Sequence, residues 1–339
     1  MSATQKAQVF RSFGLDQLKM EERDIPRPGA GELLIQMKAA SLNFRDLLMV
    51  AGQYNPKLKM PMVPCSDGVG VVQEVGPHCH RFKEGARVSP IFARGWHDGP
   101  AFREMLKSTH GGPLDGTLQQ YMLVPEADVV SIPDYLTDEE AAAIPCAGLT
   151  AWSAVVEKGP VRPGEKLLIL GTGGVSMFAL QFGVLSGAEI IITSGNDEKL
   201  ERAKTMGAHH TINYRDKPSW EKEVYRITGG RGVDHVIEVG GVGTLEKSIR
   251  SVRPGGSIYL IGVLAGKEAP LDLTPVLMQD IRIQGVVVGS RRAFENMNQA
   301  LAVHKVRPVV DKVFSFEETT EAFAYLKSGS HFGKVCIRI

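Results

Sequence analysis

A glycine-rich turn is the segment of this sequence whose residue types most clearly suggest chemistry. The apolar run Leu167–Leu170 is followed by Gly171, Thr172, Gly173, Gly174 and Val175, and a helix is predicted over residues 177–187. Glycines let the backbone turn sharply and approach a pyrophosphate, whose charge the free N–H groups opening the next helix bind. A β-branched strand over residues 189–193 completes the order strand, turn, helix, strand. We therefore predict a nicotinamide cofactor site.

The end of the second strand indicates which nicotinamide cofactor binds. NAD-binding domains usually place an acid there, which grips the ribose hydroxyls and repels a 2′-phosphate. Here the strand is followed by Ser194, Gly195 and Asn196, and Lys199 is close enough to reach a phosphate. The nearby acids, at positions 197 and 198, suit the first turn of a helix predicted over residues 197–206. The pattern favours NADPH (NADP+) over NADH.

The usual third glycine of the turn is replaced by Ser176. That glycine serves close packing between helix and strand. We expect the serine to fit with a slight shift of the helix and cofactor binding to survive.

A second group of candidate residues lies nearer the N-terminus. Asn43 precedes a helix predicted over residues 44–50, within which Arg45 and Asp46 can form an ion pair. Tyr54 lies on the following loop, where a phenol can face a ligand. Asn is a favoured N-cap, so capping is the alternative to a ligand contact for Asn43. Thr150, at the opening of a later helix, has the same two interpretations.

Composition limits the partners. With 339 residues, 43% of them apolar and 23% charged, the chain is long enough for two domains with cores of their own. A formal net charge of +1 provides no field that would hold nucleic acid or an anionic membrane. No apolar run reaches the ~18 residues that span a bilayer, and no leader is visible. We predict a cytoplasmic protein with a small-molecule substrate.

The cysteines show no metal or redox spacing. Cys65, Cys79, Cys146 and Cys336 lie far apart, so we expect reduced thiols. The tight cluster His78-Cys79-His80 follows a strand and lies in a turn. Three neighbouring side chains in a turn rarely converge on one ion without a distant fourth ligand, so we predict no metal there.

The sequence has two parts that differ in their predicted secondary structure. Up to residue 135 the sequence has short strands with Gly and Pro between them, the clearest over residues 33–39, 68–75, 87–90 and 119–124. From residue 136 helices and strands alternate, which predicts a doubly wound parallel sheet. Its later strands are expected over residues 210–212, 233–239, 257–262 and 281–288. The tail over residues 290–339 is expected to return to the first domain, with helices over 293–304 and 319–328 and strands over 309–314 and 334–339.

Several ordered motifs together resemble the medium-chain dehydrogenase/reductase superfamily. They are the run over residues 41–46, the glycine turn, the closing Gly333-Lys334-Val335, the entry strand over residues 26–35 and Glu84-Gly85-Ala86-Arg87-Val88. The resemblance implies an α/β architecture with a GroES-like β domain (residues 1–135 and 290–339), a Rossmann domain (residues 136–289) and an active site in the cleft. It also implies a homodimer that pairs through the last Rossmann strand, residues 282–288.

The resemblance further implies that a zinc site has been lost. In the zinc-dependent branch a Cys, a His-Glu pair and a later Cys or Asp hold the catalytic metal. Here those positions correspond to Asn43, to Cys65-Ser66-Asp67 and to Cys146, which can equally be a small buried residue. The four-cysteine structural zinc lobe is also missing, because residues 92–116 contain no cysteine. The chain therefore resembles the zinc-free branch, which includes quinone oxidoreductases and enoyl reductases.

Loss of zinc favours a particular reaction. Oxidising an alcohol requires stabilisation of a developing alkoxide, which a Lewis-acid metal supplies. Reducing a C=C bond conjugated to a carbonyl needs only a hydride, a hydrogen-bond donor and a weak acid. The run over residues 42–48, with Tyr54 at the same downstream offset, resembles the enoyl reductases specifically.

The same resemblance implies roles for single residues. Tyr54 either donates the α proton or only packs on the cofactor or substrate. Asn43 contacts the cofactor near the nicotinamide ribose, and Thr150 touches the nicotinamide. Tyr214 lies against the 2′-phosphate, and Lys334 contacts the pyrophosphate or is an exposed sheet-edge lysine. We predict an NADPH-dependent, zinc-independent reductase of α,β-unsaturated carbonyl substrates (enone or enoyl). The alternatives are an NADPH:quinone oxidoreductase, an alcohol dehydrogenase-like enzyme and a non-catalytic NADP(H)-binding member of the superfamily.

Overall fold

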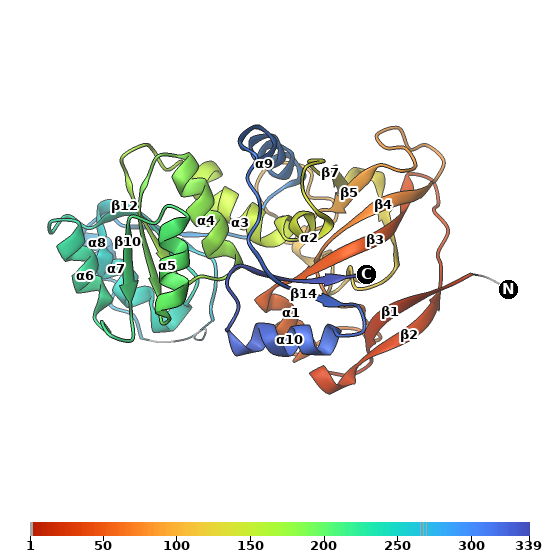
Figure 1. Cartoon of the computed structure of the whole chain (residues 1–339), viewed down its shortest axis with the longest axis horizontal. Helices are drawn as coiled ribbons and strands as arrows, with labels where there is room; N and C mark the ends of the chain where they lie inside the picture. Colours follow the sequence, from red (N-terminus) through yellow and green to blue (C-terminus); the bar gives the residue numbers. More distant parts are fainter. Residues whose placement is uncertain (1–2, 265, 267, 269) are drawn as a thin grey trace. The chain divides into compact units, whose positions relative to one another are not determined.

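Two compact units make up the chain in the computed structural model, which describes residues 3–264, 266, 268 and 270–339 (Figure 1). Unit 1 comprises Met1–Leu149 and Val288–Ile339, and unit 2 comprises Thr150–Val287. The predicted architecture, a GroES-like β domain and a Rossmann domain, is confirmed. The first boundary falls at Leu149 rather than at residue 135, because the helix α2 (Asp138–Ala142) packs on strands of unit 1. The second falls at residue 288 rather than 290.

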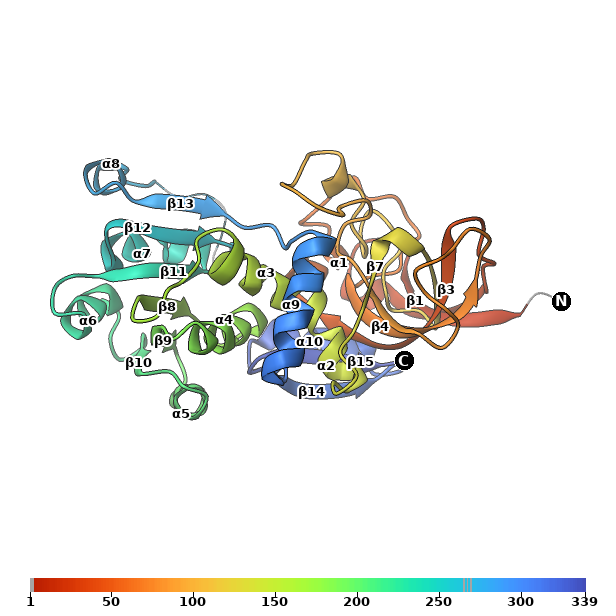
Figure 2. The same cartoon turned by 90° about the horizontal axis from the view of Figure 1, so that it is seen from above.

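Unit 1 is built on a seven-stranded sheet that joins both ends of the chain (Figure 2). The strand order is β14-β15-β3-β4-β5-β7, and β6 also pairs with β3. The bounds are β3 (Glu32–Leu42), β4 (Asp67–Val75), β5 (Arg87–Pro90), β6 (Tyr121–Pro125), β7 (Val129–Ser131), β14 (Val310–Ser315) and β15 (Lys334–Arg338). Because β15 pairs antiparallel with β3, the C-terminal tail completes this domain, as predicted.

Helices and a hairpin cover this sheet. The helices are α1 (Phe44–Val50), α2, α9 (Arg291–His304) and α10 (Thr319–Ser328). Buried Met49 of α1 and Phe323 of α10 belong to one apolar cluster with Leu42 and Ile337 from the sheet. The hairpin β1 (Thr4–Phe10) and β2 (Leu18–Asp24) was not predicted, because residues 11–17 separate its strands and form a longer connection than the roughly two to five residues of an ordinary hairpin loop.

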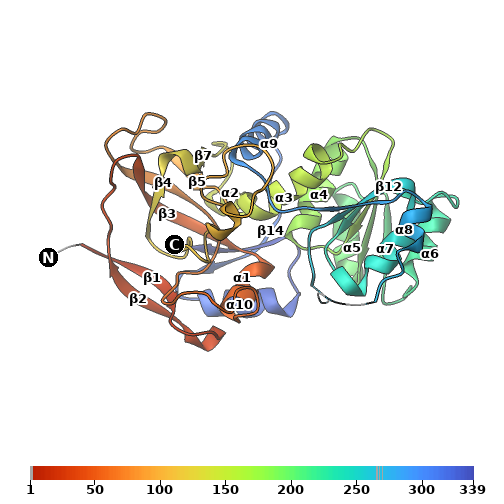
Figure 3. The ribbon, with the colours of Figure 1, turned by 180° about the vertical axis from the view of Figure 1, so that it is seen from behind.

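Unit 2 is a six-stranded parallel sheet in the order β10-β9-β8-β11-β12-β13 (Figure 2), and its helices are seen from behind in Figure 3. Its strands are β8 (Lys166–Leu170), β9 (Glu189–Ser194), β10 (His210–Asn213), β11 (Val233–Glu238), β12 (Val252–Leu260) and β13 (Arg282–Gly285). Its helices are α3 (Leu149–Trp152), which begins one residue before the unit boundary, α4 (Gly174–Leu185), α5 (Asp197–Thr205), α6 (Trp220–Ile227), α7 (Leu245–Ser251) and α8 (Thr274–Met278). Of these, α6, α7 and α8 were not predicted.

Both faces of this sheet are buried, which explains its nearly continuous apolar strands. Leu168 packs with Trp220 of α6 and Ile249 of α7. On the other face Gly183 of α4 lies so close to Leu167 that a Cβ there would come within 2.8 Å of its side chain. The sheet therefore holds the ends of β8 and β9 rigidly, and those ends carry the predicted cofactor residues.

The last strand, β13, lies at the edge of the sheet and stops at Gly285, earlier than the predicted residue 288. An open edge is what pairing between two chains requires, and the homodimer stays a prediction. In the part of the chain that the structure describes, no helix is both long and apolar enough to cross a membrane.

Candidate active site and cofactor site

Three strand ends meet in unit 1 and carry the polar residues of a candidate active site. Asn43 stands between the end of β3 and the start of α1, Asp67 begins β4, and Lys334 begins β15. Antiparallel pairing places Ser41 opposite Asp67, and Leu42 opposite Val335. Residues separated by almost 300 positions in the sequence are thereby brought together.

Lys334 is a buried ammonium held by oxygen atoms. Only 3% of the residue is exposed. Its Nζ donates to the backbone oxygen of Leu42 (2.8 Å) and to Oδ1 of Asn43 (2.6 Å), and it lies 3.9 Å from Oδ2 of Asp67. An unpaired charge would be expensive to bury, so these contacts are what keep the ammonium inside the domain. The alternative of an exposed edge lysine is wrong, because β15 lies between β14 and β3. Its predicted contact with a pyrophosphate stays a prediction.

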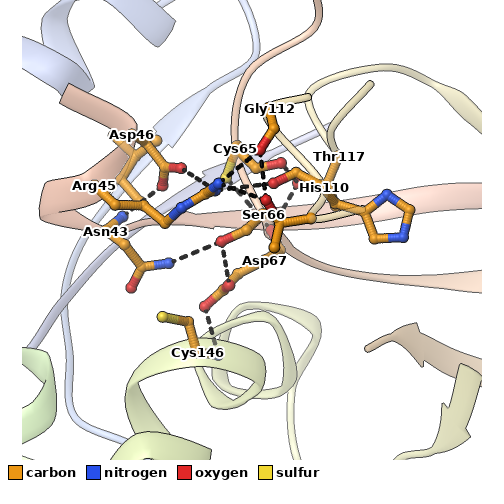
Figure 4. A network of polar contacts seen from close by, with 12 residues as sticks. Asn43, Arg45, Asp46, Cys65, Ser66, Asp67, His110, Gly112, Thr117 and Cys146 are labelled. Atoms are coloured by element: carbon orange, nitrogen blue, oxygen red, sulfur yellow. Dashed lines mark hydrogen bonds and ion pairs between the residues drawn. The ribbon is translucent and has the colours of Figure 1, made fainter. Parts of the chain in front are cut away.

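Asp67 closes a ring of polar side chains with Lys334, and Figure 4 shows its contacts with Ser66 and Cys146. Its carboxylate accepts hydrogen bonds from Ser66 Oγ (2.8 Å) and from the backbone N–H of Cys146 (3.1 Å), and Ser66 lies 3.4 Å from Nδ2 of Asn43. Burial raises the pKa of Asp67, and the nearby Lys334 ammonium opposes that rise. Four side chains, Asn43, Ser66, Asp67 and Lys334, therefore form one connected network, which we call the Lys334 ring.

Arg45 holds the loop of residues 109–112 in place through hydrogen bonds. Its guanidinium donates to the backbone oxygens of His110 (2.8 Å) and Gly112 (3.0 Å) and lies 3.5 Å from Oδ1 of Asp46. The predicted Arg45–Asp46 pair is confirmed. Burial raises the pKa of Asp46 to about 6, against the pull of Arg45. Sequence reasoning missed the hold on the loop at residues 109–112, because no local signal joins two segments so far apart.

Tyr54 stands on the surface beside Arg45. Its residue is 53% exposed, and the Arg45 guanidinium lies 5.4 Å from the centre of its ring. The same guanidinium also lies 5.0 Å from the centre of the Phe92 ring. Within the described residues the Tyr54 hydroxyl makes no hydrogen bond, so it is open to a ligand. Cation–π contacts of this kind hold an aromatic ring without using its polar group.

Cys146 and Thr150 lie on one continuous helical stretch. The π-helical turn η4 (Ile144–Gly148) leads directly into α3, and π-helical turns are frequent at functional sites. Thr150 is buried inside this stretch, so it caps no helix and the capping interpretation is wrong. Burial and the neighbouring Asp67 raise the pKa of the Cys146 thiol far above its ordinary value. Within the described ranges, no three His, Cys, Asp or Glu side chains are grouped as metal ligands require.

In unit 2 the glycine turn has the geometry of a phosphate site. Gly171 has φ +71°, which favours glycine, and Gly173 is the N-cap of α4. The helix therefore starts at Gly174, earlier than the predicted residue 177, and the N–H groups of Gly174 and Val175 lie in its first turn. Ser176 is buried, and its Oγ donates to the last carbonyl of β8, that of Leu170, at 2.7 Å. The serine thus replaces the third glycine by bonding to the strand on which the helix packs.

The end of β9 gathers the residues predicted to select the cofactor. Ser194 is buried and ends the strand, and Tyr214, which follows β10, donates its N–H to the Ser194 carbonyl (3.1 Å). A Cβ at Gly195 would lie 2.8 Å from the Tyr214 ring and 2.9 Å from Nε of Arg215. Asn196 caps α5, since its Oδ1 accepts from the N–H of Lys199 (3.0 Å). That contact fixes Lys199 in the first turn of the helix.

Arg215 is a cation that sequence reasoning missed. It is exposed, and its guanidinium has no ion pair within the described residues. The signal was present in the sequence, because Arg215 directly follows Tyr214. The sequence does not show, however, that the turn after β10 folds back onto Gly195. The end of β9 is therefore flanked by Arg215 and Tyr214 and followed by Lys199.

Comparison with known proteins finds a matching family for each of the two units. Residues 29–134 match the family described as alcohol dehydrogenase GroES-like domain, and residues 174–303 match the family described as zinc-binding dehydrogenase. A zinc-type alcohol dehydrogenase-like protein of Schizosaccharomyces pombe is 42% identical over 96% of each chain. An acryloyl-coenzyme A reductase of Sulfurisphaera tokodaii is 27% identical over 94% of this chain and 96% of its own.

A crystal structure of an NAD-dependent alcohol dehydrogenase has a TM-score of 0.91 and 35% identity, and the match covers 98% of this chain and 99% of that one. The two units thus define a two-domain dehydrogenase/reductase fold with a GroES-like and an NAD(P)-binding part. The chain belongs to the medium-chain dehydrogenase/reductase superfamily and is an oxidoreductase of that superfamily.

Proposed function

We propose that this protein is an NADPH-dependent reductase of the C=C bond of an α,β-unsaturated carbonyl compound, and that it works without zinc. The observation that carries the proposal is the Lys334 ring. At the positions where zinc-dependent relatives would hold a metal, this chain has the Asn43 amide, the Ser66 hydroxyl beside the Asp67 carboxylate, and the Cys146 thiol. The amide and the carboxylate both face an internal ammonium, that of Lys334.

These residues do not suit a zinc ion. Zinc in proteins is bound by thiolate, imidazole and carboxylate groups at about 2.0 to 2.3 Å. Here the Asn43 oxygen already accepts from Lys334 at 2.6 Å, so a dication bound to that oxygen would lie next to an ammonium. Ser66 donates to Asp67, whose carboxylate also accepts from the backbone N–H of Cys146 and is balanced by the Lys334 ammonium. No step of the proposed reaction therefore depends on a metal.

The residues of unit 1 suit a conjugated acceptor. NADPH supplies the hydride, which is delivered to the β carbon, and negative charge then develops on the carbonyl oxygen. An amide N–H such as that of Asn43 stabilises such an oxygen, and the exposed hydroxyl of Tyr54 supplies the proton for the α carbon. The relationship to a protein named acryloyl-coenzyme A reductase supports this type of reaction. The relatives named alcohol dehydrogenases make alcohol oxidation the main competing activity.

The residues at the end of β9 suit a 2′-phosphate. Ser194 stands where an acid would repel it, the Arg215 guanidinium lies near Gly195, and Lys199 is in the first turn of α5. Arginine and lysine are the usual partners of phosphate groups. The glycine turn with the start of α4 would hold the pyrophosphate, and Thr150 would contact the nicotinamide. We therefore propose NADPH as the cofactor of this chain, although a relative is named NAD-dependent.

Substrate profiling tests the proposed reaction. NADPH oxidation is followed with enones, enoyl thioesters and quinones, and NADP+ reduction is followed with alcohols. We expect the highest kcat/KM for an enone or enoyl thioester and no measurable alcohol oxidation at neutral pH. A higher kcat/KM for any alcohol than for every conjugated carbonyl compound would contradict the proposal.

Charge removal at the end of β9 tests the cofactor. Arg215→Ala and Lys199→Ala should each weaken NADPH binding by about 1 to 3 kcal/mol, the range for a charge-assisted hydrogen bond, and leave NADH binding almost unchanged. Binding is measured by fluorescence titration. Lys222→Ala, which removes an exposed charge from α6, is the control and should affect neither cofactor. Equal losses for NADPH and NADH in both variants would disprove this assignment.

Replacing Tyr54 tests the proton donor. If the phenol is the acid, Tyr54→Phe should lower the rate on the order of 10²-fold, or less if water takes its place with altered stereochemistry at the α carbon. The reaction is run in D2O, and the α deuterium is located by NMR. Tyr225→Phe, at another exposed tyrosine, is the matched control. A full rate with unchanged stereochemistry would show that Tyr54 only lines the pocket.

A further inference from the structure

We infer that Lys334 is a positioning residue, which fixes the orientation of the Asn43 amide so that its N–H edge, and not its oxygen, is offered to the substrate carbonyl. The inference rests on the proposed function and deepens it. It assigns the stabilisation of the carbonyl oxygen to Asn43 and the control of Asn43 to Lys334.

The chemistry of the two groups decides the orientation. An ammonium has three donors and no acceptor, so only the oxygen of an amide can face it as closely as 2.6 Å. The Asn43 oxygen is therefore turned toward Lys334, and the nitrogen must point the other way. In Figure 4 this nitrogen points toward Ser66.

The nitrogen keeps donor capacity for a ligand. It has two hydrogens, and the contact with Ser66 Oγ, at 3.4 Å, is long for a hydrogen bond. Ser66 donates its own hydrogen to Asp67 at 2.8 Å. Asn43 is half-buried, whereas Ser66, Asp67 and Lys334 are buried, so Asn43 is the member of the network that a bound molecule can reach. A carbonyl oxygen, which only accepts, suits this edge.

Lys334 is itself held in place. Its second hydrogen bond goes to the Leu42 carbonyl of β3, and its charge is balanced by Asp67, which the N–H of Cys146 also fixes. The ammonium therefore cannot follow a rotating amide. If Lys334 were absent, the Asn43 side chain would be free to turn its oxygen toward the substrate, where it would repel the developing negative charge. Preorganised donors of this kind lose their effect when they can reorient.

A double-mutant cycle of Lys334→Met and Asn43→Ala tests the inference, with kcat and KM measured for the best acceptor of the wild type. If Lys334 acts through Asn43, Lys334→Met should lower kcat at least about tenfold in the wild-type background. In the Asn43→Ala background it should lower kcat less than about threefold. Equal losses in both backgrounds would overturn the inference.

Two further variants guard against a purely structural loss. Lys334→Met leaves the Asp67 carboxylate without its cation, so Lys334→Met/Asp67→Asn is measured beside it and should show the same dependence on Asn43. Arg338→Met removes an exposed cation from the same strand and should leave kcat unchanged. Circular dichroism verifies that each variant is folded before its kinetics are compared.

The dissociation constant of NADPH separates this role from a direct contact with the cofactor. We expect Lys334→Met to change it less than about threefold. A rise of tenfold or more that persists without Asn43, with kcat unaffected at saturating NADPH, would overturn the inference in favour of a pyrophosphate contact. A wild type that reduces no conjugated carbonyl compound would contradict the proposed function. In that case the double-mutant cycle is run with whichever acceptor the wild type reduces. Failure of the proposed function is thereby distinguished from failure of the inference about Lys334.

Discussion

Burial of the Lys334 ammonium beside the Asp67 carboxylate is the interaction on which the candidate active site depends. Each group alone would be costly inside a protein, and removing one partner of such a pair typically costs roughly 3 to 5 kcal/mol. Here both are buried, and Leu42 and Asn43 accept hydrogen bonds from the ammonium, while Ser66 and the N–H of Cys146 donate to the carboxylate. The pair thereby turns a cluster of polar residues into a rigid network with a defined donor edge.

The fold makes this pair possible by joining the two ends of the chain. Lys334 reaches Asn43 only because β15 inserts between β14 and β3, so the C-terminal tail is a structural part of the site. The backbone also supplies partners that side chains do not. The Arg45 guanidinium donates hydrogen bonds to backbone carbonyl groups in the loop of residues 109–112. It also makes a cation–π contact with the Tyr54 ring. Unit 2 has a separate role, since its parallel strands hold the glycine turn and the end of β9.

Much of this arrangement could be predicted from sequence, for physical reasons. An apolar strand such as β8 followed by several glycines is typical of a dinucleotide-binding turn. The alternation of strands and helices after residue 136 indicated a parallel sheet. The helix α1 and the strand β5 were predicted with the bounds that the structure shows. The unit boundary was misplaced because α2 looks in sequence like the first helix of the Rossmann part, although it packs on β3 and β4. The alternative of an exposed edge position for Lys334 was wrong because sequence does not show that the strand which this lysine begins is covered on both sides. Arg215 was missed because it approaches Gly195 only through the turn that follows β10.

The central claim is that an internal ammonium and an oriented amide, and no metal, prepare this site for a carbonyl oxygen. The most direct measurement is the zinc content of the protein purified from zinc-supplemented cells, together with its reductase activity before and after chelation. We predict much less than one zinc ion per chain and unchanged activity after chelation. One zinc ion per chain that is lost, together with activity, when Cys146 is changed to serine would contradict the account.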